Sequence, residues 1–457
     1  MTIEVNIAIE GCCHGELDKI YAEVNKIDDS RRPELLIICG DFQSLRSEKD
    51  LYSISVPDKY KQLGDFHSYY NKEKVAPITT IFIGGNHEAS NYLSELPYGG
   101  WVAPNIYYMG YSNVIWYKGI KIGGISGIYK SFDFYKPHYE KIPLNERSIK
   151  SIYHTRFEDY LKMSLIKQRN LNCFLSHDWP VNITNFGDLK TLLKIKPFFK
   201  RDISGGQLGS YPNWLLLKKL RPSYWFSAHL HVAFDATVKH ENKRKLSGTI
   251  TSNEPKNDNE IVLELNDELE DTKIKENSDE TNLDNPEGKA ENKDVENPKN
   301  EISLHLDHTY NRINPDEVNL ELEEELKPKV PAEEISGGFS HTTFLALDKC
   351  LPKRKFLQVL KIPISTHESA NTDSLYYDEE YVKINQFFET FRSSEFFKNL
   401  KMNDINEELI EQLQKEIINV KITDDFVVPQ NFESNEENPM SQTKAYVERF
   451  FSNFESS

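Results

Sequence analysis

The sequence predicts that residues 1–240 form a layered α/β domain, and three observations support this fold class. Short apolar runs recur along this segment, and most of them end at a Gly, Asp, Asn or His. Helix-like runs such as Leu17–Lys26 and Arg156–Arg169 lie between several of them. No run of about 18 apolar residues occurs, so no membrane-spanning helix is expected. Buried strands that end in polar residues are typical of α/β enzymes.

The predicted strands of this domain are short and apolar. In chain order they are Ile3–Ile9, Leu35–Cys39, Thr79–Ile83, Ile120–Ile125, Cys173–Ser176 and Tyr224–Ser227. Ligands in α/β sheets bind at the carboxyl ends of the strands, so the residues that follow these runs are the first candidates for a site.

Charge and composition change after residue 240. Residues 1–250 hold 33 Lys and Arg against 26 Asp and Glu, a net charge of +7. Residues 251–335 hold 9 against 26, a net charge of −17. The segment 241–335 has few aromatic residues and cannot bury enough apolar surface to offset its ordering entropy, so we expect a disordered acidic connector. The mildly basic first domain remains compatible with a polyanionic substrate.

A smaller folded segment follows the connector. The runs FSHTTFLALDKC and KFLQVLKI predict two strands, and residues 376–420 have a helical pattern with phenylalanine anchors. We therefore expect a C-terminal α+β domain over residues 336–422 and a polar tail over 423–457. The chain has five cysteines, an odd number, which argues against a disulfide framework and for a reducing compartment. Its acidic N-terminus lacks the features of a signal peptide, so secretion is not expected.

Five short motifs follow the predicted strands of the first domain. They are Gly11-Cys12-Cys13-His14-Gly15, Cys39-Gly40-Asp41-Phe42, Gly84-Gly85-Asn86-His87-Glu88, Ser176-His177-Asp178 and Ser227-Ala228-His229-Leu230-His231. Together they supply imidazoles, carboxylates, an amide and a thiol, which are ligands for divalent transition metals. Each has an ordinary alternative: the cysteines could be buried thiols, and Asp41 could be a turn residue. All five in order, each at a strand end, predict a metal centre.

The order of these motifs resembles the calcineurin-like metallophosphoesterase family. That family begins with an Asp where this chain has Cys12, and its last motif begins with Gly where this chain has Ser227-Ala228. A Cys at this position resembles the RNA lariat debranching enzymes. Further stretches agree with the narrower resemblance: 98–108, 123–129, 176–180, 224–231 and 342–352. The resemblance implies a metallophosphoesterase β-sandwich flanked by helices, followed by the smaller C-terminal domain of the debranching enzymes.

The resemblance also implies a role for each motif residue. Asp41 would bridge two metal positions. The first position would take Cys12, His14, Asp41 and His231, and the second would take Asp41, Asn86, His177 and His229. His87 would donate a proton to the leaving oxygen or hold the phosphate. Glu88 or Asp178 would orient a neighbouring imidazole. The thiolate of Cys12 favours Zn²⁺ or Fe²⁺ over Mg²⁺, Mn²⁺ remains a candidate, and the number of ions, one or two, stays open.

The segment 127–139 interleaves Tyr and Phe with Lys and His, and it resembles a lariat-recognition loop. Aromatic rings can stack on unpaired bases and lysines can pair with phosphates. The candidate RNA contacts are Gly127, Tyr129, Lys130, Tyr135, His154 and Arg156, with Arg147, Lys200 and Arg201 as further phosphate contacts. The alternative is that the aromatic residues pack under a long loop and the cations are solvated.

The resemblance implies a phosphodiesterase that hydrolyses the 2′–5′ bond at the branch point of excised intron lariats, which feeds intron turnover in mRNA processing. Two alternatives are another metallophosphoesterase, such as a nucleotide phosphodiesterase or a protein phosphatase, and a non-catalytic scaffold. The expected partner is branched lariat RNA, with no DNA and no membrane; protein partners are unknown. The acidic connector is either a tether or an autoinhibitory RNA mimic. A nuclear location is expected, with the cytoplasm as a further possibility.

Overall fold

The computed structural model describes residues 3–240, 338–420, 425–429, 432 and 440–451. The expectation of a disordered connector over 241–335 lies outside these residues. Within them, the strands are β1 (Glu4–Glu10), β2 (Leu35–Ile38), β3 (Thr80–Phe82), β4 (Gly100–Ala103), β5 (Ile106–Tyr108), β6 (Ser112–Tyr117), β7 (Ile120–Ile125), β8 (Cys173–Ser176), β9 (Tyr224–Ser227), β10 (Phe234–Lys239), β11 (His341–Ala346), β12 (Leu357–Pro363) and β13 (Leu375–Tyr377). All six predicted strands of the first domain are confirmed.

The α-helices are mostly short. They are α1 (Leu17–Asn25), α2 (Phe66–Tyr70), α3 (Ser90–Leu93), α4 (Ser131–Phe134), α5 (Ser148–Ser151), α6 (Phe157–Ser164), α7 (Leu189–Ile195), α8 (Phe199–Ser204), α9 (Tyr211–Leu220), α10 (Glu379–Phe391), α11 (Glu395–Asn399), α12 (Glu407–Ile418) and α13 (Ser441–Phe451). Among the described helices, none combines the length and apolarity needed to cross a membrane.

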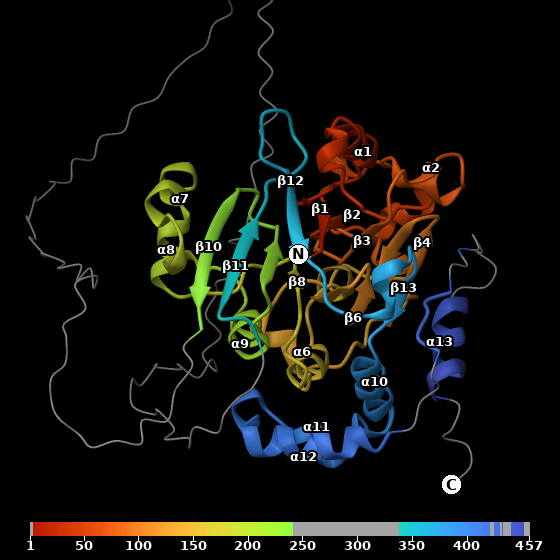
Figure 1. Cartoon of the computed structure of the whole chain (residues 1–457), viewed down its shortest axis with the longest axis vertical. Helices are drawn as coiled ribbons and strands as arrows, with labels where there is room; N and C mark the ends of the chain where they lie inside the picture. The colour runs from red at the N-terminus through yellow and green to blue at the C-terminus, as the bar shows by residue number, and fades with distance from the viewer. Residues whose placement is uncertain (1–2, 241–337, 421–424, 430–431, 433–439, 452–457) are drawn as a thin grey trace, which may run out of the picture. The chain divides into compact units, whose positions relative to one another are not determined.

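Two sheets pack face to face and confirm the predicted β-sandwich (Figure 1). One sheet has six strands in the order β12-β1-β2-β3-β5-β4, and the other has seven in the order β10-β11-β9-β8-β7-β6-β13. Ile7 and Ile37 of the first sheet share one buried cluster with Ile122, Leu175 and Phe226 of the second. This cluster forms the core between the sheets, because side chains alternate between the two faces of each strand.

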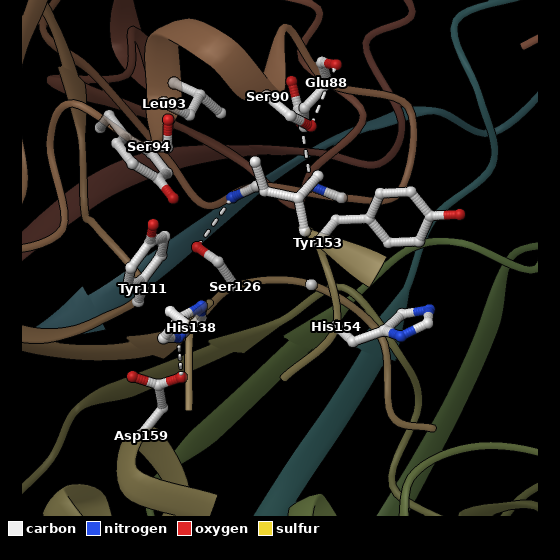
Figure 2. Close-up of a pocket in the computed structure, with 15 residues that line it drawn as sticks. Glu88, Ser90, Leu93, Ser94, Tyr111, Ser126, His138, Tyr153, His154 and Asp159 are labelled. Carbon is white, nitrogen blue, oxygen red and sulfur yellow. Dashed lines mark hydrogen bonds and ion pairs between the residues drawn. The ribbon is translucent and has the colours of Figure 1, made fainter. Parts of the chain in front are cut away.

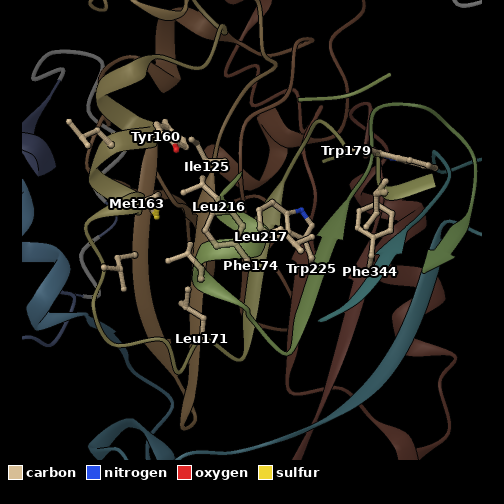
Figure 3. Packing of buried hydrophobic residues seen from close by; sticks show 14 of the residues in the cluster. Ile125, Tyr160, Met163, Leu171, Phe174, Trp179, Leu216, Leu217, Trp225 and Phe344 are labelled. Atoms are coloured by element: carbon tan, nitrogen blue, oxygen red, sulfur yellow. The ribbon is translucent and has the colours of Figure 1, made fainter. Parts of the chain in front are cut away.

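Helices cover the outer faces of both sheets. Leu17 and Ile20 of α1 pack with Leu36 and Ile38 of β2 and with Phe66 of α2. On the other side, a larger cluster joins α6 and α9 to the seven-stranded sheet, as Figure 3 shows for Met163, Leu216, Leu217, Phe174 and Trp225. The sandwich is therefore a four-layer arrangement that leaves the ends of the sheets free for loops.

The C-terminal segment predicted over 336–422 adds strands to both sheets of the sandwich. Strand β11 lies between β10 and β9 in the seven-stranded sheet, and β12 pairs with β1 at the edge of the six-stranded sheet. Residues on both sides of the connector thus form one compact unit. Strand pairing between segments this far apart in sequence leaves no local signal, whereas the helical prediction for 376–420 holds over α10, α11 and α12.

The predicted polar tail over 423–457 also contains ordered structure. Residues 441–451 form helix α13, in which Tyr446, Phe450 and Phe451 are buried. The ring of Tyr446 stacks on Tyr98 with the ring centroids 4.8 Å apart. The spacing of Tyr446 and Phe450, one helical turn, is the sequence signal for this helix. Polar neighbours outnumber these aromatic residues, and for that reason composition alone predicts a tail.

Candidate active site

The first ligand loop follows β1 and turns sharply. His14 has φ 48° and Gly15 has φ 77°, and the backbone N–H of His14 donates to the carbonyl of Asp41 at 2.7 Å. Cys12 lies in the core between the sheets, whereas Cys13 belongs to the cluster under α1. The two adjacent cysteines therefore point to opposite sides of the six-stranded sheet, and only Cys12 faces the other ligand loops.

Cys12, His14, Asp41 and His231 converge in one cluster. Their four candidate ligand atoms all lie within 4.8 Å of one another. Nε2 of His14 lies 3.0 Å from Nε2 of His231 and 3.6 Å from Oδ2 of Asp41. The set combines one thiol, two imidazoles and one carboxylate, which suits a four-coordinate transition metal. This is the set of residues that the sequence assigns to the first metal position.

Burial sets the protonation of this cluster. It lowers the pKa of His14 to about 4 and that of His231 to about 2, so both imidazoles are neutral and keep a lone pair for a metal. Burial raises the pKa of the Cys12 thiol, and the charge of Asp41 raises it further. A bound cation would reverse this effect, because a ligating thiol is deprotonated.

The second position lies on the other side of Asp41. Nε2 of His177 lies 3.3 Å from Oδ1 of Asp41 and 3.2 Å from Oδ1 of Asn86. The rings of His177 and His229 have centroids 5.0 Å apart. Nδ1 of His177 donates to the carbonyl oxygen of Cys39 at 2.8 Å, which leaves Nε2 as the ring nitrogen that faces Asp41 and Asn86. The structure thus brings together the four residues that the sequence assigns to this position.

Asp41 stands between the two positions, with Oδ2 toward His14 and Oδ1 toward His177. Burial opposes its ionisation, but the imidazoles of His177, His87 and His14 hold the pKa of Asp41 well below its usual range. An ionised carboxylate with one oxygen on each side is the arrangement that a bridging ligand requires.

Four of the ligand residues occupy strained backbone conformations. His14, Asp41, His229 and His231 have φ values of 48°, 48°, 63° and 47°, in the left-handed region. Neighbouring glycines leave room for the ligand side chains: a Cβ at Gly40 would lie 2.3 Å from Nδ1 of His177. Such strain costs of order 1–3 kcal/mol per residue and concentrates at functional sites.

His87 lies beside the cluster and is held by its backbone and one ring nitrogen. Its N–H donates to Oδ1 of Asp41 at 2.8 Å, and its Nδ1 lies 2.9 Å from the carbonyl oxygen of Ser55. The ring centroid is 5.9 Å from that of His14. With Nδ1 bound to the Ser55 carbonyl, Nε2 is left to face a substrate. Ser55 has no motif around it, and sequence reasoning missed it.

The two residues expected to orient an imidazole behave differently. Glu88 accepts backbone hydrogen bonds from Gly85, Phe42 and Gln43, at 2.8–2.9 Å, and among the described residues no hydrogen bond or ion pair joins it to an imidazole. It ties two ligand loops together instead. Burial and the charge of Asp41 raise its pKa to about 7. Oδ1 of Asp178 lies 3.9 Å from Nε2 of His229, while its Oδ2 accepts the backbone N–H of Tyr129 at 3.1 Å.

A small cavity lies next to the third ligand loop, with Gly84, Gly85 and Glu88 among its lining residues (Figure 2). Its free space is about 30 Å³, room for one or two water molecules. Ser126 closes it by accepting the N–H of Gly84 at 2.9 Å and donating to the carbonyl of Gly110 at 2.6 Å. His138, stacked on Tyr111, bonds Asp159 at 2.9 Å. The hydrogen bonds around the cavity hold the loop in place, and the cavity itself is too small for a nucleotide.

The six predicted RNA contacts separate into buried and accessible groups. Arg156 is fully buried: it bonds the carbonyls of Asp133 and Ser151 and the carboxylate of Glu140, so the prediction is wrong for Arg156. His154 is 5% exposed and bonds Asp133 at 2.7 Å, and the prediction is wrong for it as well.

The other four candidates differ in exposure. Gly127 is buried with φ 88° against the carbonyl of Tyr153, so it has no side chain to offer and serves the turn. Tyr129 is half-buried and packs against the hydrophobic cluster that joins α6 and α9 to the seven-stranded sheet. Lys130 and Tyr135 are exposed. The sequence of a charged loop does not show whether an arginine in it is buried or exposed, so the burial of Arg156 could not be predicted.

Comparisons with known proteins agree with this site. The profile of the calcineurin-like phosphoesterases matches residues 5–233, and that of the lariat debranching enzyme C-terminal domain matches 339–453. The chain is 39% identical to a lariat debranching enzyme of Saccharomyces cerevisiae over 98% of this chain and 99% of that one. It is 40% identical to one of Schizosaccharomyces pombe over 85% and 80% of the two chains.

A human lariat debranching enzyme is 52% identical over 53% of this chain and 44% of its own length. The alignment with the yeast relative spans both segments of the fold, on either side of the connector. On these grounds, the chain belongs to the lariat debranching enzymes, within the calcineurin-like phosphoesterases.

Proposed function

We propose that the chain hydrolyses the 2′–5′ phosphodiester bond at the branch point of excised intron lariats and releases linear RNA. The observation that carries the proposal is the convergence of Cys12, His14, Asp41 and His231 in a family of lariat debranching enzymes. The products would be a free 2′-hydroxyl at the branch nucleotide and a 5′-phosphate on the released end.

The residues present fit divalent metal ions at two adjoining positions that share Asp41. When bound, such ions lower the pKa of water and neutralise phosphate oxygens. The protein supplies neutral imidazoles, an ionised carboxylate and strained loops that fix both sets of ligands before substrate arrives. Because Cys12 adds a soft ligand, we propose Zn²⁺ or Fe²⁺ at the first position, with Mn²⁺ as a substitute.

His87 is the proposed general acid. The Ser55 carbonyl and the Asp41 carboxylate fix the orientation of this residue. Its Nε2 would donate a proton to the leaving 2′-oxygen of the branch nucleotide, a step that contributes typically 10²–10⁴-fold in such enzymes.

The proposed RNA surface begins at the second metal position and extends along the loop after β7. The N–H of Tyr129 bonds Asp178, and the next residue, Lys130, is exposed. Beyond it Phe132, Tyr135 and Tyr139 are 66%, 44% and 41% exposed, enough for bases to stack. A surface groove next to them is lined by Lys136, Tyr139, Asn145, Arg147 and Ser148. Arg156 underlies this surface as its buried scaffold.

A substrate panel tests the proposal. Purified protein is incubated with a 2′–5′ branched RNA, a linear 3′–5′ RNA of the same sequence and a phosphate monoester. We expect cleavage of the branch alone, and no cleavage by Asp41→Asn, which removes the shared carboxylate charge. Cleavage of the linear RNA at the same rate would indicate a general nuclease, and preferential release of phosphate from the monoester would indicate a phosphatase.

We further propose that the chain acts in the nucleus, where spliced introns are produced, with the cytoplasm as the alternative. All five cysteines are free and buried, as a reducing compartment allows. Fluorescence microscopy of the tagged full chain, with fractionation as the second method, tests this location; exclusion from the nucleus would contradict it.

A further inference from the structure

The loop between β11 and β12, which belongs to the C-terminal segment, packs directly on the first ligand loop. Residues 12 and 349 form an isolated parallel bridge, and the N–H of Cys350 donates to the carbonyl of Cys12 at 3.3 Å. A Cβ at Gly11 would lie 2.2 Å from the carbonyl oxygen of Asp348. On the other side, the N–H of Leu347 donates to the carbonyl of Ser227, just before His229. Residues 347–350 therefore lie between the two loops that build the first metal position.

The pairing fixes the direction of the Lys349 side chain. Residues opposite each other in a ladder place their side chains on the same face, and neighbours along a strand alternate. Cys13 and Cys350 belong to the same buried cluster under α1. Cys12 and Lys349 therefore share the opposite face, on which the Cys12 thiol joins the metal ligands.

Among the described residues, the Lys349 ammonium has no ion-pair partner. The charge of the adjacent Asp348 acts both on Lys349 and on Arg354, with which Asp348 pairs at 3.4 Å. Lys349 is half-buried, and its bridge to Cys12 places its side chain on the face of the first metal position.

We infer that Lys349 binds a non-bridging phosphate oxygen of the RNA at the first metal position. An ammonium on the face of the metal ligands can donate a charged hydrogen bond to a phosphodiester oxygen, with or without bound metal. This role rests on the proposed function and extends it, since the C-terminal segment would then complete a site whose metal ligands all come from the first 231 residues. Lys349 would be a substrate-binding residue, and the metal would not depend on it.

The test compares Lys349→Met with Lys355→Met, which removes an exposed cation from the same loop. Binding of fluorescent branched RNA to metal-free protein is measured by anisotropy across a salt series. We expect the Kd to rise about 10- to 100-fold for Lys349→Met, the effect of losing one charged hydrogen bond, and less than about twofold for Lys355→Met. The slope of log Kd against log salt should fall by about 0.7–0.9 for Lys349→Met.

Further measurements separate binding from folding and from turnover. Lys349→Arg should restore most of the affinity, and metal content and Tm should match the wild type in all three variants. A Kd for Lys349→Met within twofold of the wild type, or equal losses in both Met variants, would overturn the inference. Because binding is measured without turnover, a wild-type protein that binds but does not cleave the branch would count against the proposed function alone.

Discussion

The two ends of the paired sheets are built in different ways. At one end, β1, β2, β8 and β9 run into loops that carry the metal ligands, several of them with φ near +50°. At the other end, β10 and β11 form a regular antiparallel pair, with Lys239 opposite His341 and the N–H of His240 donating to Ser340 at 2.8 Å. The chain leaves this pair for residues 241–337 and returns to it.

The difference shows that many contacts fix the backbone at the ligand end, whereas the opposite end tolerates an insertion. Strained loops persist only when many contacts fix them, and at the ligand end Glu88 ties two of them through three backbone hydrogen bonds. At the opposite end, β10 and β11 pair directly. A long insertion between two paired strands is tolerated, because the entropy cost of closing the loop grows slowly with the number of residues in it. Substitutions at the ligand end should therefore change catalysis, and those at the opposite end should change stability or nothing.

The largest effect is expected for His87→Ala. Turnover on branched RNA should fall at least about 100-fold, the lower range for loss of a general acid, while metal content stays at the wild-type level. The loss should shrink on a diester with a nitrophenolate leaving group, which needs no proton. Steady-state kinetics on both substrates with elemental analysis checks this. Loss of metal, or an equal loss on both diesters, would contradict the assigned role.

A smaller effect is expected for Cys12→Asp, which replaces a soft ligand with a hard one of the same charge. The ratio of kcat/KM with Mn²⁺ to that with Zn²⁺ should rise about tenfold, because carboxylates favour harder ions. Metal-stripped protein reconstituted with each ion provides the measurement. Cys13→Ala is the matched control, since Cys13 faces the core under α1. An unchanged ratio would show that the thiol does not touch the metal.

At the opposite end, Lys219→Met should change stability. Burial, with the charge of Arg169, lowers the pKa of Lys219 to about 7, against about 10.4 in an unfolded chain. Between these values the unfolded state binds the proton and the folded state does not, so stability rises with pH from 7 to about 10. Lys219→Met should remove this rise and increase Tm at pH 7 by about 1–3 °C. Thermal melts across this pH range test it, with the exposed Lys218→Met as control; identical curves for the two variants would refute it.

The smallest effect is expected when residues 241–337 are replaced by Asn-Gly, which supplies a turn of the kind that joins paired strands. Because β10 and β11 pair directly with each other, kcat/KM on branched RNA should stay within about twofold of the wild type. Kinetics and thermal melts of the two proteins provide the test. A rise in activity would support an autoinhibitory connector, and unfolding would show that the hairpin depends on it.

Much of the ligand end could be predicted from the sequence, because each ligand loop follows an apolar run, and Cys12, Asp41 and Asn86 each follow a glycine. The run before Asp41 predicts a buried strand, and Gly40 marks a turn that no other residue fits. Pairing of β11 and β12 with distant strands could not be predicted, since it depends on contacts across the connector. The burial of Arg156 and the hydrogen bond between His87 and the Ser55 carbonyl could not be predicted from the sequence either. Both depend on loops that are distant in the sequence and come together only in the folded protein.

If the ligand end of the sheets forms a metal centre that cleaves the RNA branch, cleavage must depend on bound metal. The most direct test strips the protein of metal and adds Mn²⁺, Zn²⁺ or Fe²⁺ singly, while bound metal and cleavage of branched RNA are measured together. We expect cleavage to return in proportion to bound metal, and we expect Cys12→Ala to bind less metal and cleave less. A protein that binds metal fully and leaves the branch intact with every ion would contradict this expectation.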